Sequence, residues 1–259
     1  MLWFLFVLCL LFAGAAAGFG YRLLKNRARR KQRFITGPWP IPTRRIEEVE
    51  PRFAPDELGP TRASEVFFIG KGHNAVKGGA NDDETWILCV LARQARDMFE
   101  FGTCTGKTAY LWARNSAPGA RVTTITLDPG TVAQYRADAG DMEVGRKHAE
   151  EESIFERFYY SGTDVEAKVT QLFGDSKALD ETPYLGRFDL IFVDGSHAYS
   201  YVKSDTQKAL RMLAPGGLLL WHDFRPKMAD VFRYLCELSA TLPLTHIQDT
   251  NLVVYRKPG

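Results

Sequence analysis

Hydrophobic and polar positions divide the chain from residue 81 onward into alternating strand-like and helix-like segments. Five runs rich in apolar or β-branched residues are predicted strands: 98–102, 121–128, 168–175, 188–195 and 217–223. Segments of helical spacing lie before and between them: 81–98, 108–115, 144–158 and 199–213. Nearly continuous apolar strands that alternate with helices are typical of a parallel sheet covered by helices on both faces. The pattern therefore predicts an α/β, Rossmann-like, doubly wound fold.

Two further strand-like runs close the chain, at residues 245–249 and 251–257. They are close enough in sequence to form a hairpin, which makes the last strand antiparallel. A doubly wound sheet binds its ligand at the carboxyl ends of its strands, near the point where the strand order reverses. The residues that end the strands are therefore the candidates for function.

The N-terminal segment differs from the rest of the chain. Residues 1–21 carry no charged side chain, and a helix of this length rises about 31 Å, roughly the thickness of a bilayer core. Seven basic residues follow at once: Arg22, Lys25, Arg27, Arg29, Arg30, Lys31 and Arg33. A secretory signal peptide, cleaved near Ala15–Ala17, is the competing interpretation. Signal peptides, however, carry their positive charge before the apolar run, whereas the basic residues of this chain follow it. We therefore predict an uncleaved transmembrane helix whose basic flank, and the domain after it, stay in the cytoplasm.

A basic and proline/glycine-rich linker, residues 22–80, is expected between this anchor and a domain of residues 81–259. Residues 38–60 hold six of the 13 prolines, a composition typical of a semi-rigid spacer. The glycine-rich stretch 69–80 matches no phosphate-binding motif and is expected to be an irregular loop.

The net charge of the chain reflects its N-terminal segment. The chain has 33 basic and 31 acidic residues, and without the seven basic residues before position 34, 26 basic residues remain against 31 acidic ones. Residues 34–259 thus carry about −5, which gives no electrostatic footprint for nucleic acid. The four cysteines include no pair at metal-ligand spacing, so neither a zinc site nor a disulfide framework is expected.

The first predicted strand ends in a glycine-containing loop, Phe99–Tyr110, with the sequence FEFGTCTGKTAY. A nucleotide phosphate loop needs four residues between its first glycine and the Gly-Lys pair, whereas Gly102 leaves three. A nicotinamide-binding loop needs a middle glycine where this chain has Cys104. Two glycines four residues apart still permit a tight turn and a close approach of the backbone to a ligand, although an ordinary strand–helix turn has the same composition.

Acidic residues end the remaining strands as well. Asp128 follows Gly106 by 22 residues, where a carboxylate can accept hydrogen bonds from a ribose diol. Asp175 and Ser176 can read an adenine edge, and the next two strands end in Asp194 and in His222–Asp223. Core packing does not predict an acid at every strand end, so this row indicates a ligand site.

These residues together resemble a known family. The segments FEFGTCTGKTAYLWA, TITLDPG, QLFGDS, FDLIFVDGSHAYSYVKSDTQKAL and LAPGGLLLWHD are similar to a class I S-adenosylmethionine-dependent methyltransferase. The likeness is to the group with a DGxH segment and a terminal His-Asp, the methyltransferase domain 24-like proteins, and it covers about residues 81–257. It implies a seven-stranded sheet with an antiparallel last strand and S-adenosylmethionine as cofactor.

The resemblance also implies roles for individual residues. The methionine part of the cofactor would be surrounded by Glu100, Gly102, Thr103 and Gly106. Asp128 would hold the ribose, and Asp175 with Ser176 would flank the adenine. Cys104 departs from the pattern, because many members have a third glycine there.

Methyl transfer needs a positioned acceptor and a group that takes the acceptor's proton. The resemblance assigns the catalytic residues Asp194 and His197, with His197 as the base. It also suggests a divalent metal ion on Asp194, Asp223 and His222, as in metal-dependent O-methyltransferases. Relatives carry an acidic or another polar residue where this chain has His222, so an oxygen-ligated ion, a softer ion and no metal all stay open.

Structural interpretations stand beside these roles: Asp194 orienting the cofactor's amino group, His197 capping a helix, and His222 with Asp223 as a structural pair. We predict a membrane-anchored methyltransferase that acts on an oxygen of a small-molecule or lipid-like acceptor. The alternative is a non-catalytic, membrane-tethered binding or assembly protein that retains the fold.

Overall fold

The computed structural model describes residues 20–21, 40–72, 79–127, 130 and 132–259. The chain forms two compact units, residues 1–39 and 40–259, and the second contains the sheet. Within the described ranges, no helix has both the length and the apolar character that are needed to cross a membrane. The predicted anchor falls on residues 1–21, of which the structure describes Gly20 and Tyr21 alone.

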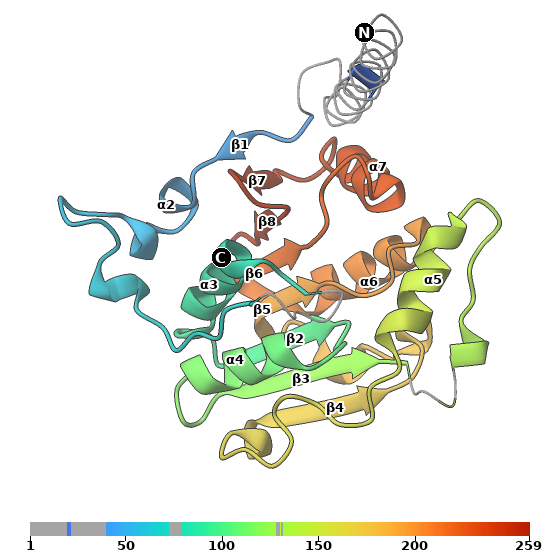
Figure 1. The fold of residues 1–259 in the computed structure, drawn as a ribbon, viewed down its shortest axis with the longest axis horizontal. Coiled ribbons are helices and arrows are strands. Elements are labelled where there is room, and N and C mark those ends of the chain that lie inside the picture. The colour runs from blue at the N-terminus through green and yellow to red at the C-terminus, as the bar shows by residue number, and fades with distance from the viewer. Residues whose placement is uncertain (1–19, 22–39, 73–78, 128–129, 131) are drawn as a thin grey trace, which may run out of the picture. The chain divides into compact units, whose positions relative to one another are not determined.

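A mixed sheet of eight strands, in the order β1-β7-β8-β6-β5-β2-β3-β4, forms the centre of residues 40–259 (Figure 1). Its parallel core consists of β2 (Asp97–Phe101), β3 (Arg121–Thr126), β4 (Val169–Phe173), β5 (Phe188–Val193) and β6 (Leu213–Trp221). The strand β8 (Val253–Arg256) runs antiparallel to both β6 and β7 (Thr245–Ile247). The predicted α/β fold and its antiparallel last strand are therefore confirmed.

The predicted number of seven strands is wrong by one. The short strand β1 (Thr43–Arg44) pairs parallel with β7 and adds an eighth strand at the edge of the sheet. Two residues between prolines and arginines give no apolar alternation, so their strand character comes from the partner strand and not from their own sequence.

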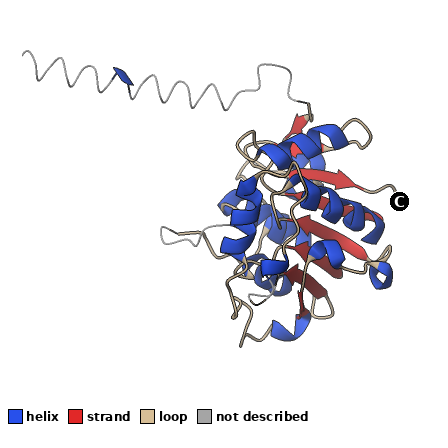
Figure 2. Ribbon diagram, turned by 90° about the vertical axis from the view of Figure 1, so that its right-hand side faces the viewer, coloured by secondary structure: helices blue, strands red, loops and turns tan. Residues whose placement is uncertain are grey.

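Helices lie on both sides of the sheet (Figure 2). They are α2 (Ile46–Val49), α3 (Asp82–Ala92), α4 (Lys107–Asn115), α5 (Glu143–Glu152), α6 (Tyr199–Met212) and α7 (Ala229–Leu238). The helix α3 packs against α4, and α6 packs against α7. The central strands β2 and β5 contribute Phe99, Phe101 and Phe192, which are fully buried in the core between these layers.

The helix α3 begins and ends for different reasons. Asn81 caps its start, because its Oδ1 accepts the backbone N–H of Glu84 (2.9 Å) while the Glu84 carboxylate accepts the N–H of Asn81 (2.8 Å). The predicted helix ran to residue 98, but the chain turns after Ala92 and β2 begins at Asp97. The carboxylate of Asp189 in β5 accepts the backbone N–H groups of Arg96 and Asp97 at 2.8 and 3.1 Å. A contact across more than 90 residues thus decides where this strand begins.

The residues before α3 differ from the expected linker of residues 22–80. From Pro40 onward they belong to the same compact unit as the sheet. Ile41 and Phe53 are 0 % and 3 % exposed, and the Phe53 ring packs edge-on against Trp86 of α3 with ring centroids 4.9 Å apart. The indole N–H of Trp86 donates to the backbone oxygen of Ser64 (3.0 Å). A few apolar side chains at irregular spacing therefore bind a proline-rich segment to the domain.

Candidate active site

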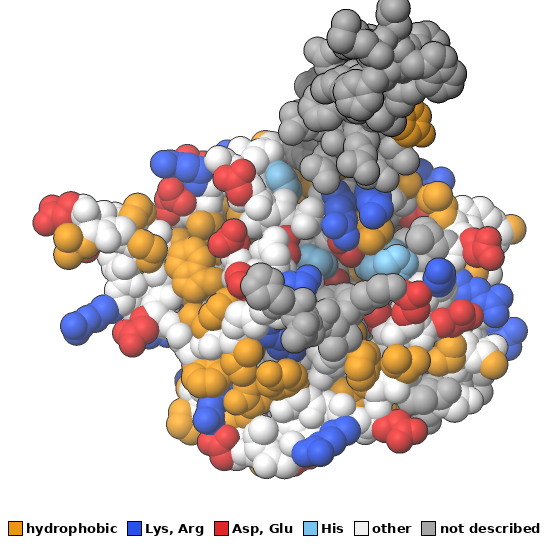
Figure 3. All heavy atoms as spheres, viewed as in Figure 1, with side chains coloured by type: hydrophobic (Ala, Val, Ile, Leu, Met, Phe, Trp, Pro, Cys, Tyr) orange, Lys and Arg blue, Asp and Glu red, His pale blue; other side chains and the backbone are white. Residues whose placement is uncertain are grey.

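The carboxyl ends of the central strands border a cavity of about 1500 Å³. Its lining includes seven of the predicted site residues: Glu100, Gly102, Thr103, Asp194, His197, His222 and Asp223. Histidine, acidic and basic side chains gather near the middle of this face of the molecule (Figure 3). The parallel sheet thus brings residues from three strand ends, more than 100 positions apart, to one place.

The glycine loop after β2 lies directly against the end of β5. Gly102 has φ +101°, and a Cβ at this position would lie 2.2 Å from the backbone oxygen of Asp194 and 2.7 Å from Cα of Gly195. The N–H of Asp194 donates to the backbone oxygen of Phe101 (2.9 Å), which holds the two strand ends together. Only glycine fits such a conformation and such a close approach of two backbones.

The rest of this loop is also in left-handed conformations. Cys104 has φ +45°. Gly106 has φ +75° and is the N-cap of α4, with no side-chain cap, and a Cβ added to it would meet the side chains of Phe158 and Tyr160 at 2.9 Å. The turn that the sequence predicted is therefore present, although Gly106 supports the loop without lining the large cavity.

Glu100 is buried beneath the glycine loop, with 2 % of its surface exposed. Burial raises the pKa of its carboxyl group to about 8, although the hydroxyl of Thr124, which donates to Oε2 at 2.7 Å, acts in the opposite direction. The hydroxyls of Thr103 and Thr124 are 2.8 Å apart, and the amide of Gln171 donates to Thr103 (3.1 Å). A hydrogen-bonded chain across β2, β3 and β4 thus fixes both Glu100 and Thr103.

The predicted adenine residues lie at a second, smaller cavity of about 50 Å³ at the ends of β3 and β4. Ser176 lines it, whereas the Asp175 carboxylate accepts the backbone N–H of Lys177 (2.9 Å) and the hydroxyl of Tyr201 (3.2 Å). The rings of Tyr135 and Tyr201 stack beside it with centroids 4.5 Å apart. This space is too small for a purine, so the side chains here must move apart to admit one. The predicted ribose ligand, Asp128, lies outside the described residues.

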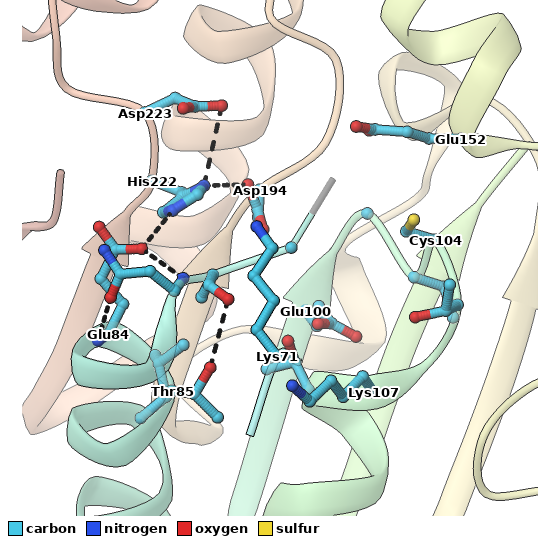
Figure 4. Close-up of a pocket in the computed structure, with 18 of the residues that line it drawn as sticks. Lys71, Glu84, Thr85, Glu100, Cys104, Lys107, Glu152, Asp194, His222 and Asp223 are labelled. Carbon is cyan, nitrogen blue, oxygen red and sulfur yellow. Dashed lines mark hydrogen bonds and ion pairs between the residues drawn. The ribbon is translucent and has the colours of Figure 1, made fainter. Parts of the chain in front are cut away.

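His222 is the centre of a buried ionic network at the end of β6. Its Nδ1 lies 2.9 Å from Oδ1 of Asp194, and its Nε2 lies 3.0 Å from Oε2 of Glu84 (Figure 4). Burial lowers the pKa of this imidazole, but Asp194 and Glu84 raise it by more, so that it lies well above its usual value. The pKa of Glu84 is lowered to about 2, because its hydrogen bonds, above all that from His222, outweigh the effect of its burial.

His197 forms a second buried pair, with Asp223. Its Nε2 lies 2.8 Å from Oδ2 of Asp223, and Arg225 forms an ion pair with the other oxygen of that carboxylate. The carboxylate of Asp223, with help from Glu152 and Asp194, raises the pKa of His197 against the effect of burial. The Nδ1 of His197 is buried and has no hydrogen-bond partner among the described residues. An imidazole held at one nitrogen by a carboxylate, with the other nitrogen unpaired, is the arrangement of a general base.

The predicted metal ligands fit this arrangement only in part. Both ring nitrogens of His222 face carboxylate oxygens, so neither offers a lone pair to an ion, and His222 does not fit as a ligand. A different set, Asp194, His197 and Asp223, has one ligand atom each within 4.8 Å of the others. Two of these three side chains, His197 and Asp223, already form an ion pair with each other at 2.8 Å.

Sequence reasoning missed two acids of this site. Glu84 was interpretable only as a first-turn acid of α3, since its contact with His222 spans 138 residues. Glu152 extends from α5 towards the cavity, opposite Asp194 (Figure 4). Burial raises the pKa of Glu152 to about 7. The charged stretch 144–158 shows no feature that distinguishes this acid from its neighbours.

A family model described as a methyltransferase domain matches residues 99–224. No curated protein sequence matches the chain. Three solved structures are among the similar ones. The O-methyltransferase TomG from Streptomyces achromogenes, in complex with S-adenosylmethionine, is 19% identical over 72% of this chain and 84% of that one, with a TM-score of 0.46. The methyltransferase PaMTH1 from Podospora anserina, bound to S-adenosylhomocysteine, is 16% identical over 70% of this chain and 80% of that one, with a TM-score of 0.48. An O-methyltransferase from Bacillus cereus, in complex with S-adenosylhomocysteine, is 18% identical over 70% of this chain and 84% of that one, with a TM-score of 0.46.

Proposed function

We propose that this protein, whose residues 99–224 match a methyltransferase domain family, is an S-adenosylmethionine-dependent methyltransferase that transfers the methyl group to an oxygen atom of its acceptor. The choice of oxygen rests on the pair of His197 and Asp223 at the cavity, in which no described residue forms a hydrogen bond to the Nδ1 of His197. A hydroxyl is a poor nucleophile until it loses its proton, so its methylation benefits most from a positioned base. His197 takes this proton, and Asp223 orients the imidazole and stabilises the positive charge that forms.

The cofactor's methionine part lies over the glycine loop in this proposal. Its environment consists of Glu100, Gly102, Thr103 and Gly106, with Asp194 beside its amino group. The close approach of β2 and β5 at Gly102 supports this placement, because it brings two strand ends that border the cavity next to each other. Asp128 holds the ribose, and Asp175 with Ser176 flanks the adenine once Tyr135 and Tyr201 have moved apart.

Isothermal titration calorimetry tests the cofactor site. We expect wild-type protein to bind S-adenosylhomocysteine with a Kd on the order of micromolar. Asp128→Ala removes a charged acceptor of ribose hydrogen bonds, which should weaken binding by about 10- to 100-fold. Glu65→Gln, an exposed change with no part in the site, should leave the Kd unchanged. Absence of binding to the wild type would favour the non-catalytic binding or assembly protein and refute the enzyme.

Residues 1–21 form a single membrane-spanning helix in this proposal, with the domain on the cytoplasmic side. The uncharged run and the seven basic residues after it support this topology. An enzyme placed there meets small-molecule or lipid-like acceptors at the membrane surface. In sealed inside-out vesicles, protease should digest the domain, and in right-side-out vesicles the domain should be protected. The reverse pattern contradicts the orientation, and release of the domain by alkaline carbonate contradicts the anchor.

A further inference from the structure

Three carboxylates converge behind the proposed methyl-transfer site, and they need positive charge. Glu84 and Asp223 are 1 % and 4 % exposed, and the side chain of Asp194 is 14 % exposed. Buried carboxylates are stable only when they are paired with cations or hydrogen-bond donors. A divalent metal ion and a protonated side chain can each supply this charge.

His222 occupies the position between the three acids. Its Nδ1 lies 2.9 Å from Asp194 and 3.7 Å from Asp223, while its Nε2 lies 3.0 Å from Glu84 (Figure 4). An ionised carboxylate only accepts hydrogen bonds, so a ring nitrogen that bonds to one must carry a proton. Because both nitrogens are in this situation, the geometry is that of an imidazolium.

Glu84 fixes this imidazolium in place. Its Oε1 accepts the backbone N–H (2.7 Å) and the side-chain amide (3.0 Å) of Asn251, and its Oε2 accepts the N–H of Asn81 (2.8 Å) beside His222. These contacts come from α3 and from the turn before β8, two elements of the rigid domain. The Glu84 carboxylate therefore accepts three hydrogen bonds in addition to its contact with His222.

We propose that the imidazolium of His222, held by Glu84, takes the place of a divalent cation between Asp194 and Asp223, so that methyl transfer by this enzyme requires no metal ion. The inference rests on the proposed methyltransferase function. In it Glu84 is a positioning residue, because it acts on the site through His222. Asp194 uses its Oδ1 for His222, and its side chain also lines the cavity.

The charges around the network support this conclusion. The three carboxylates face two cations, the His222 imidazolium and the Arg225 guanidinium, so one negative charge remains while His197 is neutral, and the proton that His197 takes from the acceptor cancels it. Positive and negative charges then balance without an ion. A divalent cation on the oxygens of Asp194 and Asp223 would add two positive charges directly beside His222, and like charges in a buried site repel strongly.

Metal analysis of the full-length protein tests the proposal most directly. We expect the purified wild type to contain far less than one equivalent of any divalent metal by mass spectrometry, and to keep its activity after treatment with a chelator. A stoichiometric metal, or a loss of activity with chelator that Mg²⁺ or Mn²⁺ restores, would overturn the proposal. The metal content does not depend on turnover, so this arm remains informative if the methyltransferase assignment fails in the calorimetry.

A gain-of-binding variant provides the converse test, with Mn²⁺ alone as the probe. His222→Glu removes the imidazolium and leaves the three carboxylates with a fourth, a set of oxygen ligands that suits a hard divalent cation. Electron paramagnetic resonance should show Mn²⁺ binding at least about tenfold tighter than in the wild type. His246→Glu, a histidine on β7 away from the cavity, should produce no such gain. Equal affinity of wild type and His222→Glu for Mn²⁺ would contradict the proposal.

The role of Glu84 has its own signature. In Glu84→Gln a side-chain amide can donate to Nε2 of His222, which then carries a lone pair, so the imidazole should become neutral. The ring ¹⁵N chemical shifts of His222 report this change, and we expect the wild-type shifts to be those of an imidazolium. Asn81→Ala disrupts the same helix cap without touching His222 and controls for loss of stability. Neutral-ring shifts in the wild type, or imidazolium shifts that persist in Glu84→Gln, would refute the role.

Discussion

Gly102→Ala should strongly weaken cofactor binding. The added Cβ would lie 2.2 Å from the oxygen and 2.6 Å from the carbonyl carbon of Asp194, and both atoms belong to the backbone of the neighbouring strand end. Neither can yield without separating β2 from β5, and alanine is also strained at φ +101°. Overpacking costs about 1–3 kcal/mol and the backbone strain about 1–3 kcal/mol more. A weakening of S-adenosylhomocysteine binding by more than about 100-fold is therefore expected from calorimetry.

Gly119→Ala is the matched control. A Cβ at Gly119 meets no atom within 4 Å, and this residue lies in an exposed turn before β3. The control should bind the cofactor as the wild type does and unfold at a similar temperature. Near-normal binding by Gly102→Ala would show that the cofactor does not depend on the junction of β2 and β5, and it would remove the main support for its proposed position.

His197→Ala should lower kcat by about 10²- to 10⁴-fold, the range that a positioned general base contributes. Its Kd for S-adenosylhomocysteine should change little, because the proposed role of His197 concerns the acceptor's proton. His148→Ala is the control. The rings of His148 and His197 have centroids 4.8 Å apart but share no hydrogen bond, so this variant changes the surroundings of His197 without removing the base. We expect this control to keep most of its activity. A His197→Ala enzyme with more than half the wild-type kcat would contradict the assignment of the base.

The pH dependence gives a second measurement on the same base. A general base acts in its neutral form, so kcat should rise with pH as His197 loses its proton. Because Asp223 raises the pKa of His197, the midpoint should lie above the ordinary value of 6.5. Asp223→Asn removes this effect, so its midpoint should move to lower pH while the limiting rate falls. An unchanged midpoint in Asp223→Asn would show that another group controls the profile.

The fold was predictable because its evidence is local and repeated. Apolar strands such as Phe188–Val193 alternate with amphipathic helices, and this alternation specifies a doubly wound sheet whatever the details of packing. The limits of prediction lie where a long-range contact decides the structure. The start of β2 depends on Asp189, and the strand β1 depends on β7.

The candidate site also has a part that could be predicted from the sequence and a part that could not. Asp194, His197 and Asp223 follow strands or precede helices, so the topology alone brings them to one edge of the sheet. The partners of His222 were not predictable, because Glu84 comes from α3 and its place in the sequence indicates only a helix cap. A sequence motif therefore identified the candidate ligands of a metal, whereas the three-dimensional contacts show that one of them is already bonded at both nitrogens.

The short strand β1 has a consequence for solubility. An unpaired strand at the edge of a sheet exposes backbone donors and acceptors that can recruit another chain. The strand β7 would be such an edge, but Thr43 and Arg44 pair with His246 and Ile247 and cover it. Both residues of β1 are themselves exposed, and arginine at a sheet edge discourages further pairing. The segment that resembles a spacer by its prolines thus protects the catalytic domain from edge-to-edge aggregation.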